Sequence, residues 1–191
     1  MKTHTEDFKN ELKKMGREIK SIVLYDAGIE VDISHYVYSV TIRYDGNILK
    51  SVMKELILEC EDDLPLNKRI NYKLGVKVGN SYEYLDYGDF FTTKIEKNED
   101  TKKWIVTCYD KMINAMKDYE EITGTYPMTL LSYFSKIADA IGLETLRPPH
   151  GSFINSQLTI PRDIYKDLGY TYRDVLDEIA QATGGYIEVD L

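Results

Sequence analysis

Two aspartates in the segment YLDYGDFF, Asp86 and Asp89, are the best match in this sequence to a catalytic pair of carboxylates. Two carboxylates that flank a cleft can hydrolyse a glycosidic bond. Aspartate is also favoured in a turn around glycine, where its side chain accepts hydrogen bonds from nearby backbone amides. Because no base, nucleophile or substrate groove can be named beside this pair, the sequence favours the turn interpretation around Gly88.

Other side chains that could bind a metal ion are scattered along the chain. His4, His35 and His150 lie far apart, and the run Glu61-Asp62-Asp63 lacks the spaced carboxylates of a calcium loop. The sequence also lacks the short motifs of zinc peptidases, serine hydrolases and phosphate-binding loops. We therefore expect no metal site, no cofactor and no catalytic residue, and we expect that the protein is not an enzyme.

The two cysteines, Cys60 and Cys108, fall in separate predicted strands. Their positions in the sequence neither support nor exclude a disulfide. The N-terminal segment MKTHTEDFKNELKKMGREIK has no apolar core of a signal peptide. Two reduced, buried thiols are therefore the favoured interpretation.

Alternating apolar and polar residues between residues 21 and 109 predict seven or eight short strands, with turn signals every 8 to 12 residues or so. The predicted strands begin at Ser21 (SIVLY) and continue with 29–34, 36–44, 52–60, 71–78, 82–87, 90–97 and 103–109. This pattern is typical of a β-sandwich or β-barrel. Ahead of it, apolar residues at spacings of four and three predict a helical arm over residues 5–19.

Helical signals replace the strand pattern after Asp110, which stands where a helix N-cap belongs. Thr129 is expected to cap a helix over 130–141, and Thr171 a helix over 172–182 in which Asp174 forms a weak capping box. The last residues, 186–191, alternate like a strand but have no evident partner. The chain is therefore expected to be the N-terminal piece of a longer product.

The predicted fold class is α+β: an N-terminal antiparallel β-barrel or sandwich followed by a smaller α+β subdomain with two amphipathic helices. The predicted division is a helical arm (1–20), a β-barrel docking domain (21–112) and the α+β subdomain (113–191). The two helices share several identical residues at an offset of 42, Thr129 and Thr171 among them. Either a duplicated unit or two unrelated amphipathic helices with ordinary caps would give this likeness.

Composition narrows the class of function. The net charge of −8 argues against a nucleic-acid surface, because phosphate binding needs clustered lysine and arginine. The sequence contains no run of about 18 apolar residues, which a membrane-spanning helix would need, so no stable membrane insertion is expected. The 16 tyrosines against 5 phenylalanines suit β surfaces and interfaces that are apolar at one end and wet at the other.

Several motifs occur in a characteristic order. Tyr84-Leu85-Asp86-Tyr87-Gly88-Asp89-Phe90-Phe91 precedes a hairpin and then Val106-Thr107-Cys108-Tyr109-Asp110-Lys111-Met112. Later come Met128-Thr129-Leu130-Leu131 and the segment from Thr171 to Tyr186, which contains Arg173, Leu176, Ile179, Ala180, Gly184 and Gly185. Over most of residues 15–191 this order resembles the N-terminal region of the tail-tip, or baseplate-hub, proteins of phages and prophages of Gram-positive bacteria. Members of that family often carry "AYDKM" and "R..L..IA...GG" at these places; here Cys108 stands in the alanine position.

The resemblance implies a structural part of a virion, made in the bacterial cytoplasm and located at the tail tip. Such hubs form a ring, usually a homotrimer, that docks on the distal tail or tail tube protein and lies near the tape-measure protein. DNA passes through the ring only as cargo. Because a second barrel is typical of the family, ring formation is expected of the full-length product. No catalytic domain is implied for these residues.

Aromatic residues of the central stretch are the candidate interface: Tyr82, Tyr84, Tyr87, Phe90 and Phe91. Tyrosine and phenylalanine are enriched where proteins assemble side by side. Two other functions stay open at the level of sequence. One is a carbohydrate-binding module for host recognition that uses Tyr82, Tyr84 and Tyr87; the other, less favoured, is a cell-wall hydrolase that uses Asp86 and Asp89.

Overall fold

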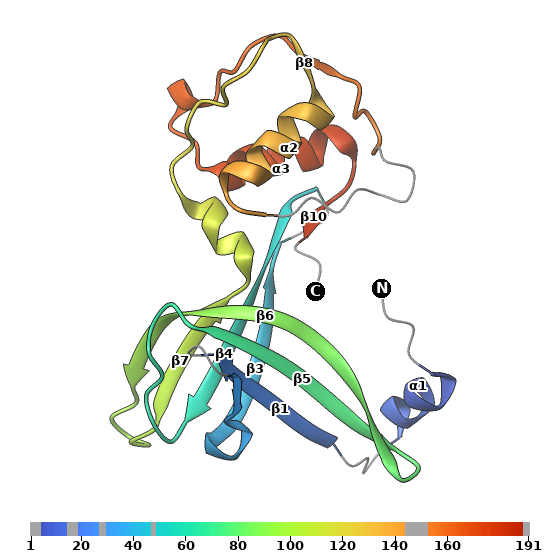
Figure 1. Cartoon of the computed structure of the whole chain (residues 1–191), viewed down its shortest axis with the longest axis vertical. Helices are drawn as coiled ribbons and strands as arrows, with labels where there is room; N and C mark the ends of the chain where they lie inside the picture. Colours follow the sequence, from blue (N-terminus) through green and yellow to red (C-terminus); the bar gives the residue numbers. More distant parts are fainter. Residues whose placement is uncertain (1–4, 15–18, 27–29, 47–48, 144–152, 189–191) are drawn as a thin grey trace. The chain divides into compact units, whose positions relative to one another are not determined.

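The computed structural model describes residues 5–14, 19–26, 30–46, 49–143 and 153–188 (Figure 1). The chain divides into two compact units. Unit 1 comprises Met1–Ile42 and Leu56–Cys108, and unit 2 comprises Arg43–Glu55 and Tyr109–Asp190. The hairpin tip between residues 43 and 55 thus groups with the C-terminal part of the chain. The predicted boundaries after residues 20 and 112 remain predictions.

Strands dominate the chain between residues 19 and 109. They are β1 (Ile19–Asp26), β2 (Glu30–Asp32), β3 (Val37–Asp45), β4 (Ser51–Cys60), β5 (Arg69–Val78), β6 (Ser81–Lys97) and β7 (Trp104–Tyr109), with the short 3-10 helix η1 (Ser34–Tyr36) before β3. β4 shows the cause most clearly: its residues alternate between buried and half-buried along almost its whole length. Alternation of this kind places every second side chain on the same face of a sheet.

These strands form one sheet with β10 (Ile187–Glu188), in the order β10-β4-β7-β6-β5-β1-β2, and β3 pairs with β4. The consecutive pairs β1–β2 and β5–β6 are antiparallel, as short hairpins require, and β1 also pairs antiparallel with the distant strand β5. The predicted α+β class is therefore confirmed. Over the described residues the sheet is not closed into a barrel, which was one form of the prediction.

The core of unit 1 lies on one face of this sheet. Its fully buried members include Val23, Leu56, Leu58, Ile70, Phe90, Val106 and Cys108. Each large apolar side chain removed from water contributes about 1.5–3 kcal/mol to stability before the entropy cost of ordering it. Cys60 and Cys108 lie in this core as free thiols, as predicted. Burial raises the pKa of Cys60 to about 11 and raises that of Cys108 further, so neither is a thiolate at neutral pH.

The N-terminal helix is shorter than predicted. α1 spans Glu6–Lys13, and Lys14 already has an extended backbone. Thr5 caps it by accepting a hydrogen bond from the amide of Phe8. Of the predicted apolar stripe (Phe8, Leu12, Met15 and Ile19), Phe8 is buried and Leu12 is exposed, whereas Ile19 begins β1 and Met15 lies outside the described residues. The lone buried anchor explains the short helix, because a helix of this length needs tertiary contacts to persist.

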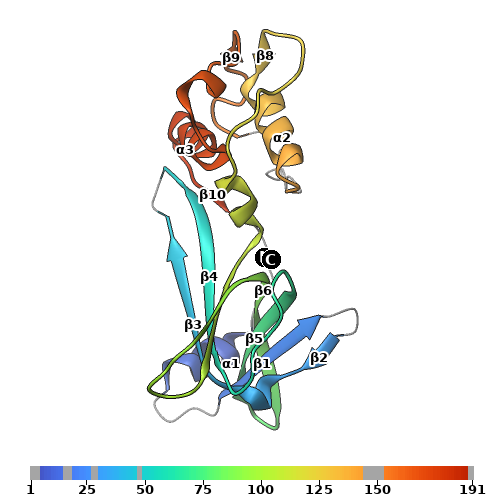
Figure 2. The same cartoon turned by 90° about the vertical axis from the view of Figure 1, so that its left-hand side faces the viewer.

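Unit 2 contains the two predicted helices, α2 (Leu130–Ala140) and α3 (Tyr172–Thr183). Its other elements are the 3-10 helices η2 (Lys111–Met116) and η3 (Lys166–Leu168) and the paired strands β8 (Met128–Thr129) and β9 (Thr159–Ile160) (Figure 2). All three predicted caps are confirmed. Thr129 caps α2, Thr171 and Asp174 form a capping box on α3, and Asp110 caps η2.

The last described strand has a partner after all. β10 runs parallel to the start of β4, with Ile187 opposite Ser51 and Glu188 opposite Val52. The sequence showed no evident partner for this strand because the partner lies more than a hundred residues earlier in the chain. β4 also supplies Met53 to the core of unit 2, which otherwise consists of side chains from η2, α2, α3 and the segments around them.

No helix among the described residues combines the length and the apolar content that crossing a membrane requires.

Candidate functional site

The predicted interface residues lie on β6, which runs as one strand through Gly88 where the sequence predicted a break. Opposite β5, Tyr72 pairs with Gly88 and Lys73 pairs with Asp86, so Tyr87 is an extra residue on β6. Gly88 has φ +86°, in the left-handed region that glycine adopts without a steric penalty. The glycine therefore produces a β-bulge within one strand rather than a turn between two.

This bulge decides which aromatic residues reach the surface. Because side chains alternate along a strand, one extra residue moves every later side chain to the other face. Phe90, which would otherwise share a face with Tyr82 and Tyr84, pairs with Ile70 and is fully buried in the core. Phe90 therefore serves packing rather than the surface of the chain.

Tyr87 also belongs to the core side, where its ring lies 5.4 Å from that of Tyr72 between centroids. Tyr82, Tyr84 and Phe91 remain on the opposite side of the sheet, which we call the outer face, and each is half-buried there. That these residues form an interface stays a prediction.

Tyr82 and Tyr84 cover Gly75 on the outer face. Gly75 pairs directly with Tyr84, and a Cβ atom at Gly75 would lie 2.6 Å from Tyr84 Cε1 and 3.3 Å from Tyr82 Cδ1. The two rings are stacked, with centroids 6.2 Å apart and planes inclined by 29°. The missing side chain of Gly75 thus lets two tyrosine rings lie flat on the sheet. We call Gly75, Tyr82 and Tyr84 the tyrosine platform.

Asp86 and Asp89 are engaged in structural contacts. Asp86 Oδ1 accepts a hydrogen bond from the amide of Gly88 at 2.9 Å, which stabilises the bulge. Its other oxygen lies 3.7 Å from Lys73 Nζ. Asp89 accepts from Asn71 Nδ2 at 3.1 Å and lies 3.4 Å from Arg69 Nη1. The local hydrogen bond that the sequence predicted around Gly88 is confirmed, although it forms in a bulge.

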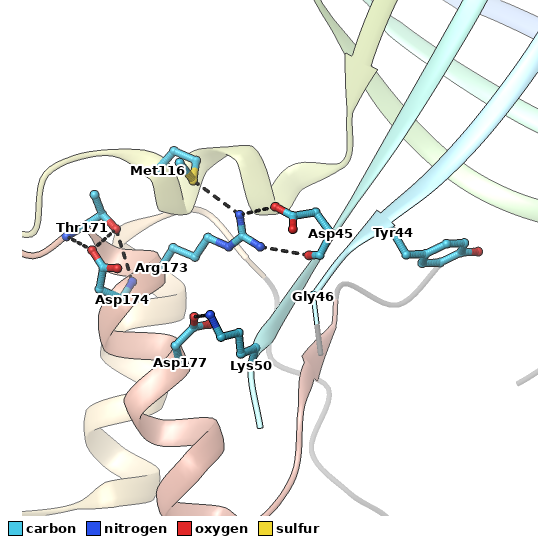
Figure 3. Close-up of a pocket in the computed structure, with 9 residues that line it drawn as sticks. All are labelled: Tyr44, Asp45, Gly46, Lys50, Met116, Thr171, Arg173, Asp174 and Asp177. Carbon is cyan, nitrogen blue, oxygen red and sulfur yellow. Dashed lines mark hydrogen bonds and ion pairs between the residues drawn. The ribbon is translucent and has the colours of Figure 1, made fainter. Parts of the chain in front are cut away.

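A second group of polar residues was not predicted from the sequence: Arg173 of α3 binds the end of β3 and the start of β4 (Figure 3). Arg173 Nη1 donates to Asp45 Oδ2 at 3.0 Å, and Nη2 donates to the Asp45 carbonyl at 2.9 Å. Nε and Nη2 also reach the hydroxyl and carbonyl oxygens of Ser51, each at 3.3 Å. Only 15% of the Arg173 side chain is exposed. Its planar fork suits this multiple contact better than a lysine would.

Asp177, one helical turn after Arg173, fixes the same hairpin from the side of β4. Asp177 Oδ1 accepts from the amide of Ser51 at 2.7 Å and from its hydroxyl group. Ser51 is fully buried, so without this carboxylate its polar groups would lack an acceptor in the protein interior. In the sequence alone, Arg173 and Asp177 look like an ordinary exposed ion pair four residues apart on a helix. We call Asp45, Ser51, Arg173 and Asp177 the hairpin clamp.

A hollow of about 540 Å³ lies beside the hairpin clamp. It is lined by Tyr44, Asp45, Gly46, Lys50, Met116, Thr171, Arg173, Asp174 and Asp177. Its charged groups are committed to the fold: Arg173 to Asp45 and Ser51, Asp177 to Ser51, and Asp174 to Thr171. Tyr44 points away from them (Figure 3). The hollow therefore offers no arrangement of acid, base and nucleophile.

A buried polar cluster joins β4, η2 and β10 within unit 2. Asp110 accepts from the amides of Lys54 and Met112, each at 3.1 Å, and Lys54 Nζ lies 2.7 Å from Glu188 Oε1. Asp110 and Lys54 are almost fully buried. Burial raises the pKa of Asp110 to about 6, against the lowering effect of its two backbone hydrogen bonds.

A second buried network links phenols to a carboxylate. Tyr119 donates to Asp163 Oδ2 at 2.6 Å, and its oxygen lies 2.6 Å from that of Tyr133. Asp163 also accepts from the amides of Ile122 and Tyr165. Burial raises the pKa of both phenols, so they stay protonated. With every oxygen engaged, this network holds the loops around α2 in place.

The remaining candidates from the sequence do not form a site. His35 lies in η1, and His4 and His150 lie outside the described residues. Glu61, Asp62 and Asp63 are exposed after β4. Within the described residues, no group of three or more histidine, cysteine, aspartate or glutamate side chains is placed to hold a metal ion.

Comparison with known proteins assigns no family. No protein-family model matches the sequence, and no curated protein matches it. A solved structure of a PdpA-VgrG complex in its lidless form is similar to this chain with a TM-score of 0.47 and 13% identity. The match covers 78% of this chain but 28% of the other. A likeness this loose assigns neither a family nor a function to this chain.

Proposed function

We propose that the chain is a structural component of a phage or prophage tail tip, in the region of the baseplate hub, and that it has no enzymatic activity. The full-length product would act as a homotrimer in the virion. It would dock on the distal tail or tail tube protein, near the tape-measure protein. DNA would pass it only as cargo. The proposal rests on the order of motifs along the sequence.

One structural observation supports it: motif residues that follow Cys108 help to hold unit 2 together. Asp110 of YDKM caps η2 and binds β4, and Met112 is fully buried. In the α3 motif, Arg173 belongs to the hairpin clamp, and Leu176 and Ile179 lie in the core. Residues that carry a family motif at a catalytic site would instead point into a cleft. Motif residues that stabilise the fold, rather than line a cleft, are what we expect of a structural protein.

Charge is consistent with a conduit role. A net charge of −8 repels DNA, so a passing strand would not be retained. The polar groups that could do chemistry are engaged with the fold, as Asp86 is with Gly88 and Asp177 with Ser51. These contacts favour the structural role over the hydrolase that Asp86 and Asp89 first suggested.

The test is to tag the gene in its own genome, induce particle production and separate particles from the remaining lysate. The proposal expects the tagged product in the particle fraction, with label at the tail tip in negative-stain images. The neighbouring genes should encode a tape-measure protein and a distal tail protein. A tagged product found outside particles, or clearing of peptidoglycan in a gel that is lost in Asp86→Asn, would count against the proposal.

A further inference from the structure

The guanidinium group of Arg173 has an acceptor for each of its N–H bonds. An arginine side chain carries five such donors, one on Nε and two on each Nη atom. Nε reaches the hydroxyl oxygen of Ser51, and Nη2 reaches the carbonyl oxygens of Asp45 and Ser51. Nη1 donates to Asp45 Oδ2 at 3.0 Å and to the sulfur of Met116 at 3.9 Å (Figure 3). The hairpin clamp is therefore completed by one thioether sulfur among oxygen acceptors.

This sulfur is the weakest of the acceptors and the most open to solvent. A thioether accepts hydrogen bonds poorly compared with a carbonyl or carboxylate oxygen. Met116 ends η2, is 47% exposed and lines the hollow beside the hairpin clamp. The other methionines that the structure describes, Met53, Met112 and Met128, are at most 8% exposed. Among these four, Met116 is thus the one that a small dissolved oxidant reaches.

We propose that Met116 is an oxidation site and that its conversion to the sulfoxide strengthens the hairpin clamp. The oxidant is hydrogen peroxide. The sulfide sulfur attacks one peroxide oxygen and the O–O bond breaks; this oxygen stays on the sulfur, and the other leaves as water. The sulfur is oxidised by two electrons, which the peroxide takes up. This inference does not depend on the proposed tail-tip role.

The new oxygen atom gives Nη1 of Arg173 a stronger acceptor. A sulfoxide is polar, and a hydrogen bond from a cationic donor to oxygen is among the stronger ones in proteins. The bond to Asp45 does not have to break, because Nη1 already directs one N–H to Asp45 and the other to Met116. Oxidation disrupts a core when the methionine is buried. Met116 is exposed, so its polar product stays in contact with water.

The test treats the purified chain with increasing hydrogen peroxide and locates the sulfoxides by mass spectrometry of its peptides. Met116 should react about tenfold or more faster than Met53, Met112 and Met128, because oxidation follows exposure. NMR of the oxidised chain, with isotope-labelled arginine, then measures exchange of the Arg173 Nε proton with water. This exchange should slow by about threefold or more, because a more tightly held guanidinium group releases its protons less often.

Two variants separate the effect of this sulfur from that of the rest of the chain. Met116→Leu keeps a similar volume but cannot take up oxygen, so peroxide should leave its Arg173 exchange unchanged. The same control accounts for oxidation of Met1 and Met15, which lie outside the described residues. Met116→Gln carries a permanent amide oxygen in place of the sulfoxide oxygen, so it should slow the exchange without peroxide.

Oxidation of Met53, Met112 or Met128 ahead of Met116 would overturn the proposal. Unchanged or faster Arg173 exchange in the chain oxidised at Met116 would also overturn it, because the new oxygen would then fail to hold Nη1. The same conclusion would follow if Met116→Gln and Met116→Leu exchanged at equal rates.

Discussion

At the scale of single residues, Gly88 determines which aromatic side chains face the core of unit 1. Its positive φ allows the bulge, and the bulge turns Phe90 inward and leaves Tyr82 and Tyr84 outside. Asp86 secures this conformation from two residues away. The sequence predicted a strand break at this glycine. In the structure it instead lets one continuous strand place Tyr82 and Tyr84 on the outer face and Phe90 in the core.

Replacing Gly88 by alanine should destabilise the protein by about 1–2 kcal/mol, because an L-residue with a Cβ pays a steric cost in the left-handed region. Urea unfolding followed by tryptophan fluorescence would measure the loss. Ser81→Ala, an exposed change at the start of the same strand, is the matched control and should alter the free energy of unfolding little. Equal effects of the two changes would contradict the role assigned to Gly88.

Because its pKa is raised, Asp110 should lower the free energy of unfolding as the pH rises, which is the opposite of the usual effect of an aspartate. Its pKa is raised from an ordinary value near 3.8 to about 6 by burial. The folded protein therefore binds this proton more tightly than the unfolded chain does. The stabilising effect of that proton is fully present below pH 4 and is lost as the pH rises to about 6, a change on the order of 3 kcal/mol.

The variant Asp110→Asn isolates this contribution, because the charges of Lys54 and Glu188 around the site stay in place. Between pH 4.5 and pH 7, the free energy of unfolding of the wild type should fall relative to that of the variant. Asp32 and Asp174, whose pKa values are lowered by hydrogen bonds, act in the opposite direction in both proteins and cancel. Parallel pH profiles of wild type and variant would show that Asp110 has no raised pKa.

At the scale of elements, the hairpin clamp explains how α3 holds the turn between β3 and β4. Two residues one helical turn apart act together: Arg173 donates to the carbonyl oxygens of Asp45 and Ser51, and Asp177 accepts from the amide of Ser51. Ser51 also begins the segment of β4 that pairs with β10. Helix, hairpin and last strand therefore depend on the same few polar contacts.

Asp177→Ala should cost about 1–3 kcal/mol, because it leaves the buried amide and hydroxyl of Ser51 without their acceptor. Hydrogen exchange should show faster exchange of the Ser51 amide than in the wild type. Lys50→Ala is the matched control, since Lys50 is half exposed and its ammonium group lies 3.9 Å from the same carboxylate. An unchanged exchange rate at Ser51 in Asp177→Ala would refute the clamp.

At the scale of the whole molecule, unit 2 is built from two separate parts of the chain. The segment Arg43–Glu55 contributes Met53 to its core, Ser51 to the clamp and a strand edge to β10. The rest of unit 2 follows Cys108. The chain therefore has to fold the β3–β4 hairpin before, or together with, the C-terminal part.

A fragment of residues 109–191 should consequently lack a cooperative unfolding transition, since it has no partner for β10 and a gap in its core where Met53 packs. Near-ultraviolet circular dichroism and thermal melting would measure this. Adding a synthetic peptide of residues 43–55 should restore tertiary signal, and the same peptide with Ser51 and Met53 changed to glycine should not. A cooperative transition of the fragment alone would contradict the discontinuous unit.

Local patterns in the sequence were enough for much of the fold. The Thr129 and Thr171 caps, the helices that they begin and the strands around Tyr72 and Val106 each depend on residues within a few positions of one another. A cap is a hydrogen bond over three residues, and a strand face is an alternation of period two, so both can be read without knowing the partner. The absence of a recognisable catalytic motif likewise came from the sequence.

Contacts between distant residues decided the rest. Arg173 meets Asp45 across 128 positions and Asp177 meets Ser51 across 126, and no local rule connects such pairs. The partner of β10 and the tyrosine platform over Gly75 likewise arise only when separate strands come together. The face on which Phe90 lies depended on whether Gly88 made a turn or a bulge, and only pairing with β5 settled that. The sequence by itself determined the elements and their caps, because these are local. The tertiary structure decided which side chains meet, because that depends on register and pairing across the whole chain.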